Sequence, residues 1–180
     1  MDKLAVKKYL EKLQNEICVT LSSADKNSFL ADRWERAEGG GGESRLFSNG
    51  SFIEKGGVNF SHVFGNSIPT AATIKRPELV GAAWEAMGVS VVIHPSNPHV
   101  PTVHMNVRFF SARKGDTDIW WFGGGYDLTP FYGYEDDCIH WHCSAKKVCD
   151  KFSESLYQKL KKNCDEYFFL PHRNLSLIHI

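Results

Sequence analysis

The sequence predicts an α+β fold, a large and mostly antiparallel β-sheet with α-helices packed on it. Residues 45–55 form two short strand-like stretches around Asn49-Gly50, a dipeptide typical of β-hairpins. Residues 3–22 repeat apolar side chains at the spacing of an amphipathic helix. Several of the expected strands follow one another through short connections, which favours antiparallel pairing.

The first half of the chain is expected to hold two helices and three strands. The helices cover residues 3–22 and 28–37, and the glycines at 39–42 end the second one. The hairpin over residues 45–55 supplies two strands. Residues 58–64 alternate apolar and polar side chains, as a half-buried strand does.

The second half begins with an expected helix over residues 77–87, which has proline at its first turn and Gly88 just past its end. Residues 88–94 are rich in β-branched side chains and predict a buried strand. Three prolines predict a loop at 95–101. The remaining expected elements are strands over residues 102–110 and 118–122 and a helix over residues 143–164.

Bulk composition narrows the class of protein. The 180 residues, 42% of them hydrophobic, suffice for one core, and we expect a single domain over residues 1–174. A net charge of zero argues against nucleic-acid binding. No apolar run reaches the roughly 18 residues of a membrane span, and the charged N-terminus is unlike a signal peptide. The five cysteines lack CxxC spacing and predict free thiols in the cytoplasm.

The stretch from Trp120 to His142 is the most unusual part of the chain. It combines glycines, many aromatic side chains, several acids and two histidines. This mixture is typical of a concave site with aromatic walls, close backbone approach at Gly123–Gly125 and titratable groups. The glycine spacing does not match a nucleotide-binding loop.

A polar row on the strand over residues 102–110 is the sharpest local signal. His104, Asn106 and Arg108 point to one side of this strand, while its other side is apolar. Arg108 could clamp a carboxylate, Asn106 could orient a polar edge of a ligand, and His104 could act as an acid–base group or metal ligand. The alternative is an ordinary solvated face.

Further histidines could join this row. His94 ends the preceding strand and can converge with His104 if the two strands lie side by side. His140 and His142 would share a face in an extended segment but diverge in a helix. Histidines on separate segments can form a metal site, although a single histidine among aromatics is more often a packed core residue. For Asp127 a turn-forming role is the simple alternative to a functional one.

The chain resembles the oxygen-dependent coproporphyrinogen III oxidases, bacterial type. The resemblance extends through many ordered motifs and includes the whole stretch from Trp120 to His142. The other motifs are Gly-Gly-Gly-Gly-Glu-Ser-Arg45, Gly57-Val-Asn-Phe-Ser-His62, Arg76-Pro-Glu-Leu, Glu85-Ala-Met-Gly-Val-Ser-Val-Val-Ile-His-Pro95, His104-Met-Asn-Val-Arg-Phe-Phe110 and Phe168-Phe-Leu-Pro-His-Arg173.

This resemblance implies a broad antiparallel sheet with helices on both faces and a cytoplasmic homodimer. It implies that molecular oxygen decarboxylates two propionates of coproporphyrinogen III, giving protoporphyrinogen IX without an organic cofactor. His104 would be the acid–base residue, and Asp127 would face the pyrrole nitrogens. Substrate contacts would be Ser90, Asn106, Val107 and Arg108. A divalent metal, if used, would be held by His94, His104, His142 and His172.

The family is longer than this chain, and the resemblance stops near Arg173-Asn174. Residues 175–180 match nothing in the family, so we expect them to be a non-family tail such as an adaptor or cloning scar. An incomplete sheet predicts an aggregation-prone fragment of weak activity. Two other functions stay open: a fragment that only binds tetrapyrroles, and a generic His-metal hydrolase, which the lack of an HExxH motif disfavours.

Overall fold

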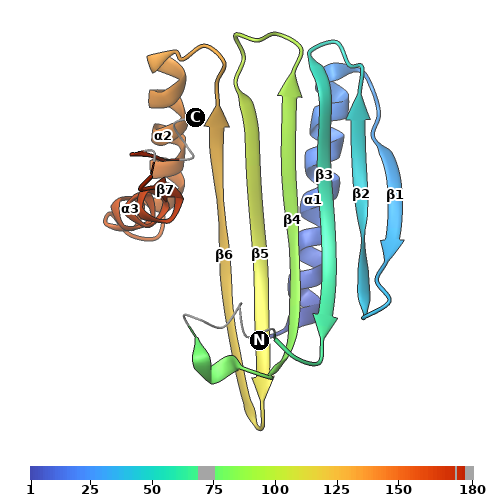
Figure 1. Ribbon diagram of the computed structural model, residues 1–180. Helices are drawn as coiled ribbons and strands as arrows, with labels where there is room; N and C mark the ends of the chain where they lie inside the picture. The colour runs from blue at the N-terminus through green and yellow to red at the C-terminus, as the bar shows by residue number, and fades with distance from the viewer. Residues whose placement is uncertain (69–75, 173, 177–180) are drawn as a thin grey trace.

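A computed structural model describes residues 1–68, 76–172 and 174–176 of the chain. Its centre is a six-stranded antiparallel sheet in which every strand pairs with its neighbour in sequence, in the order β1-β2-β3-β4-β5-β6 (Figure 1). The strands are β1 (Leu30–Glu35), β2 (Gly40–Ser48), β3 (Ile53–Gly65), β4 (Ala83–Pro95), β5 (Thr102–Lys114) and β6 (Thr117–Thr129). The predicted α+β class with an antiparallel sheet is therefore confirmed.

The helix α1 (Lys3–Asp25) crosses behind β3 and β4 in Figure 1. Its N-terminus is capped by Asp2, whose side chain accepts a hydrogen bond from the Ala5 backbone N–H. Its apolar stripe buries Leu10 and Cys18 against the sheet, where Val58 and Phe109 are fully buried. The predicted N-terminal helix is confirmed and continues three residues further than expected.

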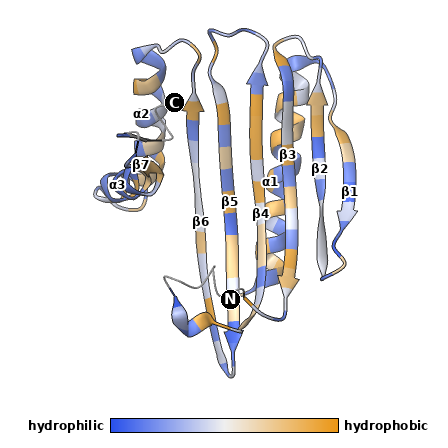
Figure 2. Cartoon of the chain, viewed as in Figure 1, coloured by the Kyte–Doolittle hydropathy of each residue, from blue (hydrophilic) through white to orange (hydrophobic). Residues whose placement is uncertain are grey.

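The sheet has two chemically different faces because successive side chains of a strand point to opposite sides. The apolar face carries Phe60, Val89, Met105 and their neighbours, and α1 packs on it. The opposite face, here called the polar face, carries glycine, serine, asparagine and histidine over its middle. Figure 2 shows hydrophobic and hydrophilic residues following one another along the strands.

The hairpin predicted at Asn49-Gly50 joins β2 to β3 and is confirmed. Asn49 adopts a left-handed backbone conformation with φ of 57°. The backbone N–H of Gly50 donates to the carbonyl of Ile53, closing the turn. Asp25, at the end of α1, accepts a hydrogen bond from the Phe52 N–H at 2.8 Å and so fastens the helix to this turn.

The helix predicted over residues 28–37 is wrong, because residues 30–35 form the edge strand β1. Pairing with β2 outweighs local helix preference here. The glycines that were expected to break a helix make that pairing possible. A Cβ at Gly42 would lie only 2.5 Å from the Trp34 indole ring, so glycine leaves the space that this ring fills.

The helix predicted over residues 77–87 is also wrong. Only Pro77–Leu79 form a single 3-10 turn, η2, and β4 already begins at Ala83. Gly81, with φ of 74°, separates the two elements. Trp84 pairs into the sheet and stacks on Phe110 with ring centroids 6.0 Å apart. This aromatic packing and pairing on both sides of β4 outweigh the helix signals.

The predicted helix over residues 143–164 is divided into α2 (Glu135–Cys149) and α3 (Leu156–Phe168). Three acids in the first turn of α2 favour an earlier start through the helix dipole. Between the helices, the Ser153 hydroxyl accepts from the Ser155 backbone N–H, and such local bonds compete with helical ones. In Figure 1, α2 and α3 stand beside the edge strand β6.

The contacts of α2 fall on the same apolar face that α1 covers. Trp141 of α2 meets Tyr126 of β6 edge to face, with ring centroids 4.7 Å apart. After α3 the chain forms the short pair β7 (Phe169–Leu170) and β8 (Leu175–Ser176). The predicted tail starts at residue 175, and residues 177–180 lie outside the described residues. No helix in the described residues is long and apolar enough to cross a membrane.

Candidate functional site

The polar face brings together site residues that lie far apart in the sequence. The strand register aligns Asn59, Ser90, Asn106 and Gly125 in one row across β3 to β6. The next row along the strands aligns Val92, His104 and Asp127, and the row on the other side aligns Gly88, Arg108 and Gly123. The predicted residues Ser90, His104, Asn106, Arg108 and Asp127 therefore occupy one continuous patch.

Glycines form much of the floor of this patch. Gly57, Gly88, Gly123 and Gly125 all belong to the polar face by strand alternation. A Cβ at Gly125 would meet no atom within 4 Å, so the space above it is open. Sheet positions without side chains let a flat ligand approach the backbone closely. The glycines of 123–125 thus lie within β6, which continues seven residues beyond the strand expected at 118–122.

The His104–Asp127 pair lies at one end of the glycine floor. His104 Nδ1 is 2.8 Å from Asp127 Oδ1, and both side chains are about one-third exposed. When Nδ1–H donates to the carboxylate, Nε2 becomes the basic nitrogen of the neutral ring. Among the described residues Nε2 has no hydrogen-bond partner. Asp127 is therefore a strand residue that orients an imidazole, and the turn-forming alternative is wrong.

Arg108 lies at the other end of the floor. Its Nε is 3.7 Å from where a Cβ of Gly123 would be, so the side chain extends over that glycine. Arg108 is exposed, and no acidic side chain of the described residues forms an ion pair with it. A planar guanidinium presented in this way suits a carboxylate, which it can bind through two parallel hydrogen bonds.

Two asparagines stand between these ends. The Oδ1 atoms of Asn59 and Asn106 are buried and have no hydrogen-bond partner among the described residues. Such unpaired amide atoms are uncommon in a structural core. Asn59 was missed as a site residue, although the alternation at residues 58–64 already placed it on the polar side of its strand. Val107, a predicted substrate contact, points to the apolar face and packs against the core.

The four predicted metal ligands do not assemble in the described residues. His94 and His104 lie together, with ring centroids 6.5 Å apart. His142 instead lies on α2, where its Nδ1 is 3.0 Å from the Tyr157 hydroxyl, and His172 follows α3 and is exposed. In residues 1–68, 76–172 and 174–176, no three His, Cys, Asp or Glu side chains gather as a metal site. The donor set seen here does not fit a bound metal.

Aromatic walls were expected from the stretch that follows Trp120. Strand alternation divides them: Trp121 lies on the polar face, whereas Trp120, Phe122 and Tyr126 lie on the apolar face, where Phe122 packs on Phe109. The expected aromatic walls of one site are therefore wrong for Trp120, Phe122 and Tyr126. His140 and His142 lie within α2 and so diverge, as the helical alternative predicted.

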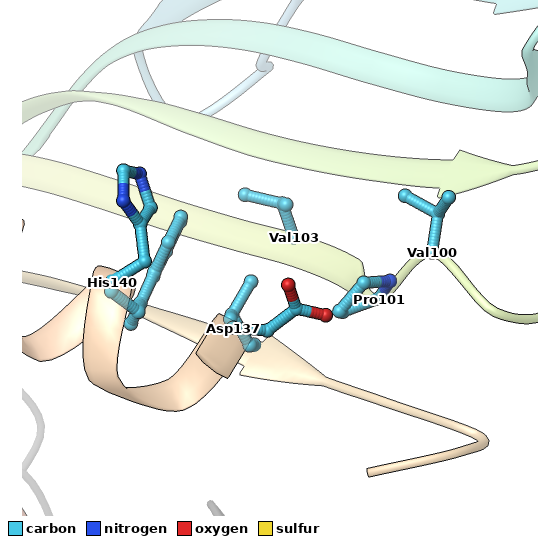
Figure 3. A pocket seen from close by; sticks show the side chains of 7 residues that line it. Val100, Pro101, Val103, Asp137 and His140 are labelled. Atoms are coloured by element: carbon cyan, nitrogen blue, oxygen red, sulfur yellow. The ribbon is translucent and has the colours of Figure 1, made fainter. Parts of the chain in front are cut away.

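A small hollow of about 210 Å³ lies on the apolar side, between α2 and the ends of β5 and β6 (Figure 3). In Figure 3, Asp137 and His140 extend from α2, opposite Val103 of β5 and Pro101 just before it. The indole Nε1 of Trp141, which also lines it, is buried without a partner among the described residues. This hollow is separate from the His104–Asp127 pair, because the sheet stands between them.

Comparison with protein families points to one assignment. The sequence model of the family described as coproporphyrinogen III oxidase matches residues 5–176, nearly the whole chain. The matched range contains β1 to β6, α2 and α3, and every residue of the polar-face patch.

Proposed function

Because the chain belongs to the coproporphyrinogen III oxidase family, we propose that it performs the oxygen-dependent reaction of haem biosynthesis. In this reaction two propionate side chains of coproporphyrinogen III become vinyl groups, giving protoporphyrinogen IX. The observation that supports the proposal most directly is the His104–Asp127 pair at 2.8 Å, beside a glycine floor and an exposed arginine. Substrate, oxygen and proton handling can each be related to this patch.

The chemistry sets clear demands on the site. At each propionate the bond to the carboxylate carbon breaks and releases carbon dioxide. The side-chain carbon attached to the pyrrole ring loses the equivalent of a hydride, and a double bond forms between this carbon and the one that carried the carboxylate. Molecular oxygen accepts this hydride equivalent with one proton and becomes hydrogen peroxide. The protein must therefore hold a carboxylate, activate an electron-rich pyrrole and move a proton.

The residues of the patch match these demands. Arg108 holds the reacting propionate through its guanidinium. The Asp127 carboxylate accepts the pyrrole N–H, which raises the electron density of the ring for reaction with oxygen. His104 donates Nδ1–H to Asp127, and its Nε2 exchanges the proton that the peroxide requires. The open floor at Gly125 lets the macrocycle lie against the backbone, with Ser90 and Asn106 beneath it.

No step of this proposal passes through a metal or an organic cofactor. The four histidines His94, His104, His142 and His172 remain a prediction as metal ligands, because the described geometry brings only the first two together. Homodimer formation and a cytoplasmic location are part of the proposal through the family alone.

The decisive experiment is anaerobic incubation of this chain with coproporphyrinogen III, followed by admission of air and chromatography of the oxidised porphyrins. Appearance of the two-vinyl product only after air is admitted is the expected result. Tetrapyrrole binding without vinyl formation would instead support a binding module. Activity that needs a metal but no tetrapyrrole would support the hydrolase alternative, which no contact in the site favours.

A further inference from the structure

A second arginine lies on the polar face, beyond Arg108. The guanidinium carbon of Arg76 is 4.7 Å from the centroid of the Trp121 ring, a cation–π contact. Trp121 belongs to β6 and pairs with Phe110 of β5, on which it stacks at 4.5 Å. The segment around η2 reaches this end of the sheet in Figure 1, so Arg76 comes from a part of the chain separate from β5 and β6.

The ring beneath Arg76 is firmly placed. Phe110 and Trp121 pack against a second buried cluster, formed by Ile68, Leu79, Ala82 and Ala112. Leu79 follows Arg76 by three residues and is 3% exposed, so η2 is fixed to the sheet close to the arginine. A guanidinium stacked on such a platform loses less conformational freedom on binding an anion than a freely moving one.

Arg76 and Arg108 lie over neighbouring positions of one strand. Trp121 and Gly123 are two residues apart on β6 and share the polar face, which corresponds to about 7 Å along the strand. Arg76 lies over the first and Arg108 over the second. Two exposed guanidiniums therefore border the same end of the glycine floor.

Arg76 and Arg108 differ from three other arginines of the chain in having no acidic partner among the described residues. Arg33 and Arg45 form ion pairs with Glu43, and Arg36 forms one with Glu38. Within the described ranges, neither Arg76 nor Arg108 has a carboxylate within 4.0 Å. Two unpaired cations side by side repel each other, and this repulsion turns into attraction when anions bind between or beside them.

We propose that Arg76 is a second substrate-binding residue, which holds a further carboxylate of the same tetracarboxylate that Arg108 holds. This proposal rests on the proposed function, since it names how a substrate with several carboxylates is oriented. With one carboxylate on each guanidinium, the macrocycle has a defined rotation over the floor. Arg76 then determines which propionate Arg108 holds as the reacting one.

The test is the binding of coproporphyrin III, the stable oxidised tetracarboxylate, measured by quenching of tryptophan fluorescence. We expect Arg76→Gln to weaken binding about tenfold, the effect of losing one charge-assisted contact. Arg113→Gln is the matched control. Arg113 lies near the end of β5 that carries Phe110, but on the apolar face, and it forms no ion pair with another described residue. If direct contact with the carboxylate, and not the net charge of the protein, determines the affinity, Arg113→Gln should change the affinity by less than about twofold.

The outcomes separate the two proposals. An unchanged affinity of Arg76→Gln, or an equal loss in Arg113→Gln, overturns the role of Arg76. Arg76→Lys should recover only part of the affinity, because lysine keeps the charge but not the planar two-pronged donor; full loss of binding in this variant would also contradict a carboxylate contact. Wild-type protein that binds no coproporphyrin overturns both proposals. Binding without oxygen-dependent vinyl formation removes the reaction but leaves the second arginine in place.

Discussion

His104 and Asp127 face each other across neighbouring strands, with Nδ1 and Oδ1 2.8 Å apart, although 23 residues separate them in the sequence. The antiparallel register of β5 and β6 creates this pair directly, since the two residues are exact partners in the ladder. Its orientation therefore depends on regular sheet structure and not on a flexible loop. Sites supported in this way hold their geometry better than sites on loops.

Asp127→Asn tests the charge of this pair. The amide keeps the shape of the side chain but cannot stabilise a positive imidazole or accept a pyrrole proton, so we expect the turnover number to fall about 100-fold or more. Affinity for coproporphyrin should change little, because Arg108 is intact. Asp118→Asn is the control on the apolar face of the same strand. Turnover of Asp127→Asn near the wild-type value would remove Asp127 from the chemistry.

Arg108→Ala tests the carboxylate contact at the reacting end of the floor. Loss of a charge-assisted hydrogen bond to substrate should raise KM roughly 10- to 100-fold. Steady-state kinetics with coproporphyrinogen III provide the measurement, with Arg113→Ala as the matched arginine on the other face. The clamp is excluded if KM of Arg108→Ala equals that of this control.

Gly125→Val tests the open floor. No atom lies within 4 Å of a Cβ at this position, so the strand accepts the substitution without a clash. The new side chain should instead occupy the space of the macrocycle and weaken coproporphyrin binding about tenfold. Gly133→Val is the control, because a Cβ at Gly133 also meets nothing within 4 Å but lies beyond β6. Unaltered binding with an unaltered melting temperature would contradict a ligand at Gly125.

Much of the polar face follows from the sequence. The alternation over residues 102–110 correctly predicts that His104, Asn106 and Arg108 share a side, and the loop at 95–101 correctly predicts that His94 approaches His104. The alignment with Asp127 and Ser90 needed the register of three strands, β4 to β6. That register depends on long-range pairing, which no local pattern reports.

The errors have a common physical cause. Residues 28–37 and 77–87 contain good helix signals, such as Pro77 at a first turn, yet residues 30–35 and 83–87 pair as strands. In each case a tryptophan, Trp34 or Trp84, gains packing in the sheet that an isolated helix could not provide. Local propensity is a weak term beside such burial.

The lowered pKa of the Glu43 carboxyl predicts how the stability of the protein depends on pH. Hydrogen bonds from Arg33 and then Arg45, each at 2.7 Å, hold the pKa of this carboxyl below its ordinary value of 4.5. A lowered folded-state pKa stabilises the protein above the unfolded-state pKa, and the contribution is lost as pH falls through the folded-state value. Glu43→Gln should therefore lower the urea midpoint at pH 7, and the difference from wild type should shrink below about pH 4. A constant difference between pH 7 and pH 3 would contradict this linkage.

Gly50→Ala tests the junction between α1 and the first hairpin. A Cβ at Gly50 would lie only 1.6 Å from the buried Asp25 Oδ2 and 2.4 Å from the Phe47 ring, and neither neighbour can move freely. We expect the free energy of unfolding to fall by at least about 2 kcal/mol, since overpacking at a buried junction costs that order. Gly115→Ala separates this clash from backbone strain, because Gly115 has φ of 58° but open space around its Cβ. It should cost only about 1 kcal/mol. Equal losses in the two variants, measured by urea denaturation, would show that steric contact with Asp25 is not the cause.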